Sequence, residues 1–564
     1  MARTTKSKAK PAPLDQLAEL LGIEAQFKDA RGKLRRTTAG TKRALLAAMG
    51  VRVGDDQQIA SSLQEMIESD WHVGLQRVYV VCKSSKPIRI QITLPSNTAE
   101  ITWRLRLEDG KENSQHIETS TLALIEAREI RGERRERREL AFSRDIPIGY
   151  HRLTIDEGSR EAMLIVAPQH CWLPEAVKEN RKIWGIEAQV YTLKSQNNWG
   201  IGDFEDLRRL ADAWGPAGAE IVGVNPLHAL FPDNPEHASP YSPSSRLLLN
   251  ILYIDVTAVP EFDKCKEARA IVGSEEFQEE LRECRGATLV AYTRVTKLKL
   301  QVLRKVFQYW KAVESTSKPF FEDFCKEMGG KLARSCAFFC LRQLFVARDA
   351  ALGDWRKWPQ EYRDPESPAV RQFMEENSDE IAFAAWLQWL ADAQLSRASD
   401  AASSMTVGLY RDLAVGADPA GTETWFNQKA VVSGAHIGAP PDIFNPAGQD
   451  WGLPPFHPRE LKEQCYEGFI ELIRANMRYA GALRVDHVMA LQHLYWIPES
   501  QPPQNGAYVQ YPMEDLIGIL ALESERNRCM VIGEDLGTVP DGFRERMARA
   551  DILSYRVLFF EQES

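Results

Sequence analysis

The chain has 564 residues, of which 44% are hydrophobic and 26% charged, and its 79 acidic and 70 basic side chains give a formal net charge of −9. This apolar share excludes a mainly disordered chain, and the acidic balance excludes a nucleic-acid binder that relies on a global positive field. The longest apolar runs stop short of the roughly 20 residues that a membrane span needs, so no membrane-spanning segment is expected.

The cysteines indicate whether a metal site is expected, and together with the N-terminus they indicate the cellular compartment of the protein. The nine cysteines are scattered, without a CxxC pair or the Cys/His spacing of a zinc site, so no metal site is expected. Thiols in this pattern suit a reducing compartment. Residues 1–13 are basic but lack the apolar segment of a signal peptide, which predicts a flexible tail and a cytoplasmic protein.

The segment after the tail has helical periodicity. Leucines recur at positions 14, 17, 20 and 21, and a second apolar group follows at positions 45, 46 and 49. This spacing predicts a small helical domain over residues 14–70.

Residues 75–167 have the period of strands instead. Residues 88–94 and 101–107 alternate apolar and polar side chains, which together with the turn residues predicts a β-sandwich domain. Between the strands, residues 126–139 are rich in Arg and Glu, and we expect a solvated loop or helix face there. Because both signs are interleaved, this run does not predict a nucleic-acid site.

From about residue 180, short apolar segments end in polar, Gly- or Pro-rich stretches, with helical segments between them. The strand candidates are 187–193, 220–227, 406–413, 482–487, 529–534 and 555–560. Because polar residues gather at the carboxyl end of each, the layout predicts a parallel (β/α) barrel over 180–564 with its active site at those ends. Residues 262–400 are helical and rich in aromatic and charged residues, which predicts an inserted helical segment.

Two strand candidates carry acids at their carboxyl ends. Arg484 and Asp486 are two apart on a strand and therefore share a face, where the guanidinium favours an ionised carboxylate suited to nucleophilic attack. Glu534 follows an apolar strand and Gly533, and a carboxyl in a dry barrel mouth has the raised pKa of a general acid. An Arg–Asp ion pair closing the barrel and an acidic strand end in solvent are the structural alternatives.

Considered together, the two acids indicate sugar chemistry. An Asp and a Glu at the ends of consecutive strands can converge on one sugar, as retaining glycosidases require at about 5–5.5 Å. Loops at 198–203, 239–243 and 448–452 add aromatic rings for sugar faces and amides and acids for hydroxyls. His228 is expected either to bond a substrate hydroxyl or to support the loop structure.

Several motifs together resemble the 4-α-glucanotransferases (amylomaltases, or disproportionating enzymes) of glycoside hydrolase family 77, in the α-amylase clan. The motifs are NWGIGD at 198–203, NPLH at 225–228, SPY at 239–241, PPD at 440–442 with GQDWG at 448–452, RVDH at 484–487 and GEDLG at 533–537. The resemblance spans roughly 180–564, and the preceding domains look like those of the longer bacterial members.

The resemblance implies a role for each site residue. Asp486 is the expected nucleophile, Glu534 the acid/base and Arg484 the residue that holds the nucleophile charged and oriented. The expected substrate-binding residues are Tyr241 under the sugar, His487 on its hydroxyls, His228, and Asp442, Gln449 and Trp451 on a loop over the acceptor side. Family members pass a piece of an α-1,4-glucan or maltooligosaccharide to the 4-hydroxyl of another, without a metal or organic cofactor.

One departure from the family pattern concerns the end of the barrel. The clan uses a third acid, an Asp after Thr-His on the seventh strand, and nothing in this sequence matches it. The sequence stops just after the sixth strand candidate, so we expect a truncated or incomplete eight-stranded barrel that is poorly stable and weakly active or inactive.

Two other functions remain open from the sequence. One is an α-amylase-type hydrolase, and the other is a non-catalytic α-glucan-binding protein. The sandwich at 75–167 is either an accessory glucan-binding module or a spacer. The sequence leaves donor and acceptor preference and the oligomeric state undetermined.

Overall fold

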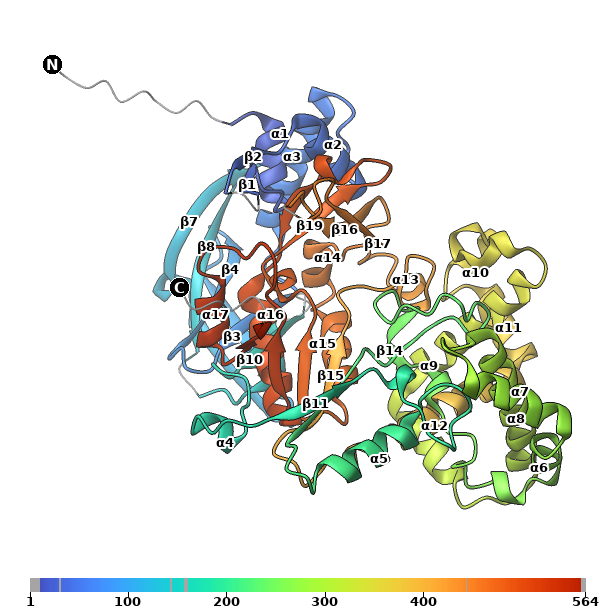
Figure 1. The fold of residues 1–564 in the computed structure, drawn as a ribbon. Helices are drawn as coiled ribbons and strands as arrows, with labels where there is room; N and C mark the ends of the chain where they lie inside the picture. The colour runs from blue at the N-terminus through green and yellow to red at the C-terminus, as the bar shows by residue number, and fades with distance from the viewer. Residues whose placement is uncertain (1–10, 30–31, 143–144, 157–160, 443, 559–564) are drawn as a thin grey trace.

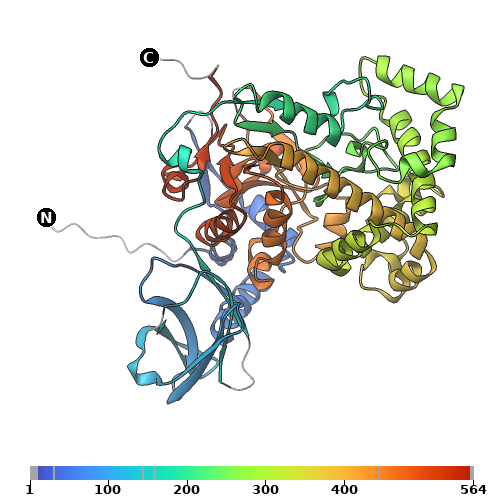
Figure 2. The ribbon, with the colours of Figure 1, turned by 90° about the horizontal axis from the view of Figure 1, so that it is seen from below.

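The computed structural model describes residues 11–29, 32–142, 145–156, 161–442 and 444–558. Most of the predicted flexible tail lies outside these residues. Figure 1 shows a β-sandwich on one side, a group of helices on the other, and a parallel sheet between them. Figure 2 shows the same separation of sandwich and helices from below.

The N-terminal segment is helical but contains a hairpin that its sequence did not predict. Its helices are α1 (Pro13–Leu20), α2 (Ala39–Ala48) and α3 (Asp56–His72), and its strands are β1 (Gln26–Lys28) and β2 (Leu34–Arg36). The hairpin strands are short and polar, so their sequence lacks the alternation that predicts strands.

These helices share an apolar core with a four-stranded antiparallel sheet formed far along the chain. The sheet has the order β17 (Gln449–Leu453), β16 (Ala435–Ala439), β19 (His493–Pro498) and β20 (Ala507–Gln510). Leu17 and Leu45 pack in one cluster with Ile437 and Trp496. The sequence did not predict this sheet, because β19 is buried along its whole length and therefore shows no alternation.

The β-sandwich consists of a five-stranded and a three-stranded sheet. The five-stranded sheet has the order β3 (Val78–Cys82), β10 (Ala162–Ala167), β9 (Gly149–Ile155), β5 (Glu100–Arg106), β6 (Glu112–Glu118). The three-stranded sheet has the order β4 (Ile88–Pro95), β8 (Glu133–Phe142), β7 (Ala123–Ile130). The prediction of a loop or helix over 126–139 is therefore wrong: this run lies on the antiparallel strands β7 and β8, where opposite charges such as Glu126 and Arg137 face each other across the pair.

The sandwich packs on helix α16 (Met513–Asn527) of the C-terminal half. Val78 and Ile165 share a cluster with Ile517 and Leu520 of this helix. At the edge of the contact, Glu523, which is 1% exposed, accepts hydrogen bonds from the Tyr150 hydroxyl and from Nε and Nη2 of Arg474. A second ion pair joins Glu108 to Arg526.

Six parallel strands form the central sheet among the described residues, which confirms the predicted parallel sheet. Their order is β11 (Gly185–Ala188), β12 (Ile221–Val224), β15 (Gly408–Leu413), β18 (Ala482–Val485), β21 (Met530–Gly533) and β22 (Leu553–Ser554). The last strand begins two residues before the predicted 555–560, and residues 559 and 560 lie outside the described part of the chain. The crossover helices are α5 (Phe204–Trp214), α14 (Pro458–Glu463), α15 (Glu467–Met477), α16 and α17 (Phe543–Arg549).

Residues 262–400 are helical in the structure, as their sequence predicts, and lie between β14 (Ser245–Leu249) and β15. The helices are α6 (Lys266–Val272), α7 (Glu275–Gly286), α8 (Tyr292–Ala312), α9 (Lys318–Val346), α10 (Gln360–Arg363), α11 (Pro368–Glu376) and α12 (Ser378–Ala401). Phe307 and Trp310 of α8 pack against Trp386 of α12. The remaining α-helices and strands are α4 (Glu175–Lys178), β13 (His228–Ala229) and α13 (Thr422–Phe426).

Candidate active site

Asp486 directly follows strand β18 and contacts the guanidinium of Arg484, as their spacing predicts. Nη1 of Arg484 lies 2.9 Å from Oδ1 of Asp486 and 2.6 Å from Oδ1 of Asp412 on the neighbouring strand. Burial raises the pKa of Asp486, and the positive charge of Arg484 opposes that rise. Arg484 therefore favours the ionised, nucleophilic form of Asp486.

Glu534 directly follows strand β21, which pairs with β18 so that Gly533 faces Val485. The two acids thus follow paired residues at the carboxyl ends of adjacent strands. Oε2 of Glu534 accepts from the backbone N–H of His487 over 3.0 Å, and Oε1 accepts from that of Leu536 over 2.7 Å. These bonds fix the carboxylate from both sides.

Burial is the main cause that raises the pKa of Glu534, which is 8% exposed. The N–H of Leu536 opposes the rise, and the negative charge of Asp486 adds to it. A carboxyl that holds its proton beside an ionised carboxylate is the arrangement that a retaining glycosidase uses.

Asp412 is a third acid at the site, which the sequence analysis missed. It lies on β15, is 6% exposed, and binds Arg484 and the Tyr241 hydroxyl, the latter over 2.9 Å. Burial raises the pKa of Asp412 to about 6, against the charge of Arg484. The signal that could have found it is the one used for Asp486 and Glu534, an acid near the carboxyl end of a parallel strand candidate.

Tyr241 joins the site from the loop between β13 and β14. Its hydroxyl donates to Asp412, while its side chain is 43% exposed. The ring is therefore anchored at one end and open to solvent on its faces, which suits stacking against a sugar.

His487 directly follows Asp486 and has a left-handed backbone conformation, with φ 48°. Burial lowers its pKa to about 4, so the imidazole is neutral near pH 7. Its ring meets the Trp451 ring edge-on at 5.2 Å between centroids, and the Trp451 indole N–H donates to Oε1 of Gln449. Trp451 thus contacts His487 directly, and Gln449 is connected to His487 through Trp451.

The other two predicted residues lie differently. Oδ1 of Asp442 accepts from the backbone N–H groups of Phe444 and Asn445 and so shapes its own loop. His228 is 1% exposed, and its Nε2 accepts from the N–H of Ala414 at the end of β15. Of its two expected roles, this contact matches structural support rather than a bond to substrate.

Trp199 also lies away from the open site, in contrast to the expectation that its loop faces a sugar. It is 3% exposed and packs edge-on against Phe277 of α7. Asp203 in the same loop caps helix α5. This motif therefore builds the junction with the inserted helices.

Within the described part of the chain, the structure has no group of three or more His, Cys, Asp or Glu residues that could hold a metal ion. No helix among the same residues is long and apolar enough to cross a membrane.

The chain matches two family profiles. One described as 4-alpha-glucanotransferase matches residues 188–564, and one described as MalQ N-terminal beta sandwich domain matches residues 75–168. The 4-alpha-glucanotransferase of Haemophilus influenzae is 39% identical over 431 residues, which cover 74% of this chain and 61% of that protein. That of Mycobacterium tuberculosis is 32% identical over 566 residues, which cover 98% of this chain and 75% of that protein.

Two solved structures are similar in fold. The crystal structure of amylomaltase from Corynebacterium glutamicum has a TM-score of 0.82 and 30% identity, with 97% of this chain and 75% of that chain covered. Amylomaltase from Streptococcus agalactiae, in complex with acarbose, has a TM-score of 0.55 and 18% identity, with 65% of this chain and 71% of that chain covered. The second likeness concerns the fold alone.

Proposed function

The chain belongs to the 4-alpha-glucanotransferase family, glycoside hydrolase family 77, and on this basis we propose that it transfers segments of α-1,4-glucans between maltooligosaccharides by a retaining double displacement. The observation that carries the proposal is the placement of Asp486 and Glu534 after paired residues of adjacent parallel strands, with Arg484 on the first acid.

In the first step, a carboxylate oxygen of Asp486 attacks the anomeric carbon of the donor. The bond from that carbon to the glycosidic oxygen breaks, and Glu534 gives its proton to the leaving oxygen. A covalent glycosyl-enzyme remains, and the shortened glucan departs. The raised pKa of Glu534 supports this role because the carboxyl must hold its proton before the bond breaks.

In the second step, Glu534 accepts the proton of an acceptor 4-hydroxyl. The acceptor oxygen attacks the anomeric carbon and Asp486 leaves as a carboxylate. We assign Tyr241 to the sugar at the cleavage point, and His487, Trp451, Gln449 and Asp442 to the sugar hydroxyls and the acceptor side.

We propose that the parallel sheet is part of a (β/α)8-type barrel, to which residues 180–564 contribute the six described strands and the inserted helices at 262–400. A helical domain (14–70) and the sandwich (75–167) precede it. The aromatic residues of the sandwich support a spacer role over glucan binding. Tyr79, Trp103 and Phe142 are buried, and the guanidinium groups of Arg474 and Arg526 each lie 4.9 Å from the centroid of the Tyr150 ring. Such residues offer no open ring to a sugar.

The test is to incubate the purified chain with maltotriose and separate the products. Glucose together with a ladder of longer maltooligosaccharides is expected. Shorter products alone would indicate a hydrolase, and binding without turnover would indicate a non-catalytic glucan-binding protein. The comparisons give no support to the expectation of a weakly active or inactive chain, and this assay measures it directly.

A further inference from the structure

The loop that carries Tyr241 is held by two different parts of the chain. It spans 230–244, between β13 and β14. On the catalytic side, the Tyr241 hydroxyl donates to Asp412 over 2.9 Å, and Oγ of Ser242 donates to Oδ2 of Asp418 over 3.1 Å. The N–H of Asp418 donates to the carbonyl of Pro243.

On the other side, the loop is held by the inserted helices. Nε of Arg342, on α9, lies 3.0 Å from both carboxylate oxygens of Asp233, and both side chains are 7% exposed. The same guanidinium lies 4.3 Å from the centroid of the Phe231 ring. At the start of α8, Thr293 donates to Glu236 through its N–H and its hydroxyl.

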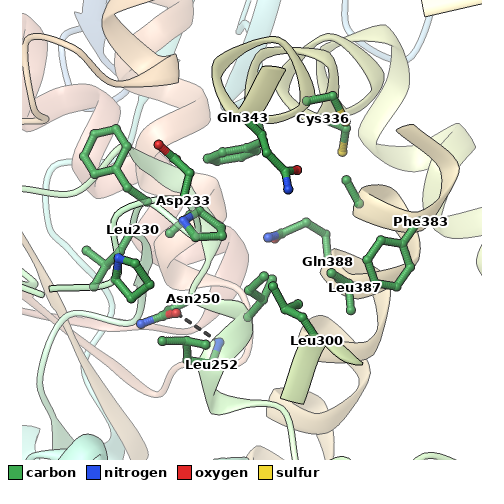
Figure 3. Close-up of a pocket in the computed structure, with 18 of the residues that line it drawn as sticks. Leu230, Asp233, Asn250, Leu252, Leu300, Cys336, Gln343, Phe383, Leu387 and Gln388 are labelled. Atoms are coloured by element: carbon green, nitrogen blue, oxygen red, sulfur yellow. Dashed lines mark hydrogen bonds between the residues drawn. The ribbon is translucent and has the colours of Figure 1, made fainter. Parts of the chain in front are cut away.

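A cavity lies between the first part of this loop, residues 230–235, and the inserted helices. Figure 3 shows Leu230 and Asp233 on one side of it and Cys336 and Gln343 of α9 on another. Next to this cavity, the Arg342–Asp233 pair is a buried polar link between the loop and α9. Either charge of this buried pair would be costly without the other, so the pair holds the loop to α9.

The link continues from Arg342 toward Tyr241. The Phe231 ring, under the guanidinium, stacks on the His237 ring at 5.3 Å between centroids and 10° between planes. Nε2 of His237 lies 3.7 Å from Oδ2 of Asp418, the oxygen that Ser242 also binds. Consecutive contacts thus connect helix α9 to the residue beside Tyr241.

We propose that Arg342 is a positioning residue for Tyr241, through which the inserted helices set how firmly the sugar at the cleavage point is held. This inference rests on the proposed transfer activity and assigns a role to the insertion, which otherwise lies outside the catalytic residues. Arg342 acts through the loop and touches no reacting atom.

The experiment compares two variants, Arg342→Met and Arg304→Met. Each substitution removes the guanidinium group and its charge but keeps an unbranched side chain. Arg304 is a control with the same kinds of contact but greater exposure: its Nη1 binds both carboxylate oxygens of Glu380, and its guanidinium lies 4.1 Å from the centroid of the Phe383 ring. Both partners of Arg304 lie on α12 and not on the loop. We expect kcat/KM on maltotriose to fall about 10- to 100-fold in Arg342→Met, and to stay within about twofold of the parent in Arg304→Met.

A double-mutant cycle with Tyr241→Ala separates positioning from general stability. If Arg342 acts through Tyr241, Arg342→Met has little further effect on kcat/KM once the ring is gone. Equal losses with and without the ring would overturn the proposal, as would an unchanged kcat/KM in a folded Arg342→Met protein. If that variant does not fold, Asp233→Asn combined with Arg342→Met removes both charges of the pair, and Arg342→Lys keeps the positive charge without the Nε donor that binds Asp233.

A readout independent of turnover keeps this inference distinct from the proposed function. With 3-fluorotyrosine in place of Tyr241, we expect one sharp ¹⁹F resonance in the parent and in Arg304→Met, and a broadened or split one in Arg342→Met. Identical spectra in all three would refute the positioning role. An inactive parent enzyme with the expected spectra would instead refute only the transfer activity.

Discussion

The backbone N–H of His487 donates to Oε2 of Glu534 over 3.0 Å. His487 is the residue after Asp486, so the turn that follows one acid also orients the other. The left-handed conformation of His487 aims its N–H at the neighbouring strand end. The separation of the two acids is therefore set by the backbone of paired strands and not by flexible side chains alone.

Asp486→Asn is expected to lower transfer activity by about 10⁴-fold or more, because the amide cannot form the glycosyl-enzyme. The change is nearly isosteric, so Arg484 keeps a hydrogen-bond acceptor and the fold remains. Maltotriose disproportionation measures the loss. Retained activity in this variant would remove Asp486 from the nucleophile role.

Glu534→Gln is expected to lower transfer from maltotriose by about 10²–10⁴-fold, because the leaving oxygen then departs without a proton. An α-glucosyl fluoride donor needs no such proton, so its first step is expected to survive in Glu534→Gln and to be lost in Asp486→Asn. Fluoride release, followed in a burst experiment, distinguishes the two. Equal loss of the burst in both variants would contradict the acid/base assignment.

Asp412→Asn is expected to change the dependence of stability on pH. The pKa of Asp412 is raised to about 6 in the folded chain. Its ordinary value is about 3.9, so the folded state holds the proton more tightly, and the associated stabilisation is present below about pH 4 and lost as pH rises through 6. Two pKa units correspond to about 3 kcal/mol.

The parent should therefore lose up to that amount relative to Asp412→Asn between pH 4 and pH 7. The unfolding midpoints of both proteins across this range provide the measurement. A constant difference between the two midpoints would contradict the raised pKa.

Tyr241→Phe keeps the ring but removes its hydrogen bond to Asp412. That bond lowers the pKa of Asp412, so its loss should raise this pKa further and move the acid limb of the kcat/KM profile to higher pH. Tyr241→Ala should instead cost about 2 kcal/mol, or roughly 30-fold in kcat/KM, because the stacking surface is lost. A similar loss in both variants would mean that the hydroxyl, not the ring, is the important group.

Glu523→Gln tests the contact between sandwich and catalytic region. It removes the charge that Arg474 binds, and we expect a loss of about 2 kcal/mol, less than for a fully buried pair because Arg474 is half exposed. Glu108→Gln breaks the more exposed pair with Arg526 and should cost less than about 1 kcal/mol. Thermal unfolding compares the two, and equal losses would show that burial at Glu523 does not matter.

The sequence predicts the parallel sheet and the pairing of Arg484 with Asp486 because both follow from short-range patterns. Apolar segments that end in acids mark the strand ends, and residues two apart on a strand share a face. The wrong prediction of a loop or helix at 126–139 has an equally local cause. Both faces of that hairpin carry charged residues, so the alternation that marks a half-buried strand is absent.

The features that the sequence did not predict depend on contacts between distant residues. Asp412 belongs to the site because Arg484, 72 positions later, binds it, and Tyr241 reaches it from 171 positions away. The same holds for β16 and β19, which pair although the strands β17 and β18 and the helices α14 and α15 lie between them in the chain. Local periodicity carries no information about such partners.

The shared core of α1–α3 and the antiparallel sheet has a consequence for synthesis. Leu45 reaches its partner Trp496 only after roughly 450 further residues have been added. At about 5–20 residues per second, this takes about 20–90 s. For that interval the apolar faces of the first three helices emerge from the ribosome without their sheet, so the segment made first is among the last to complete its packing.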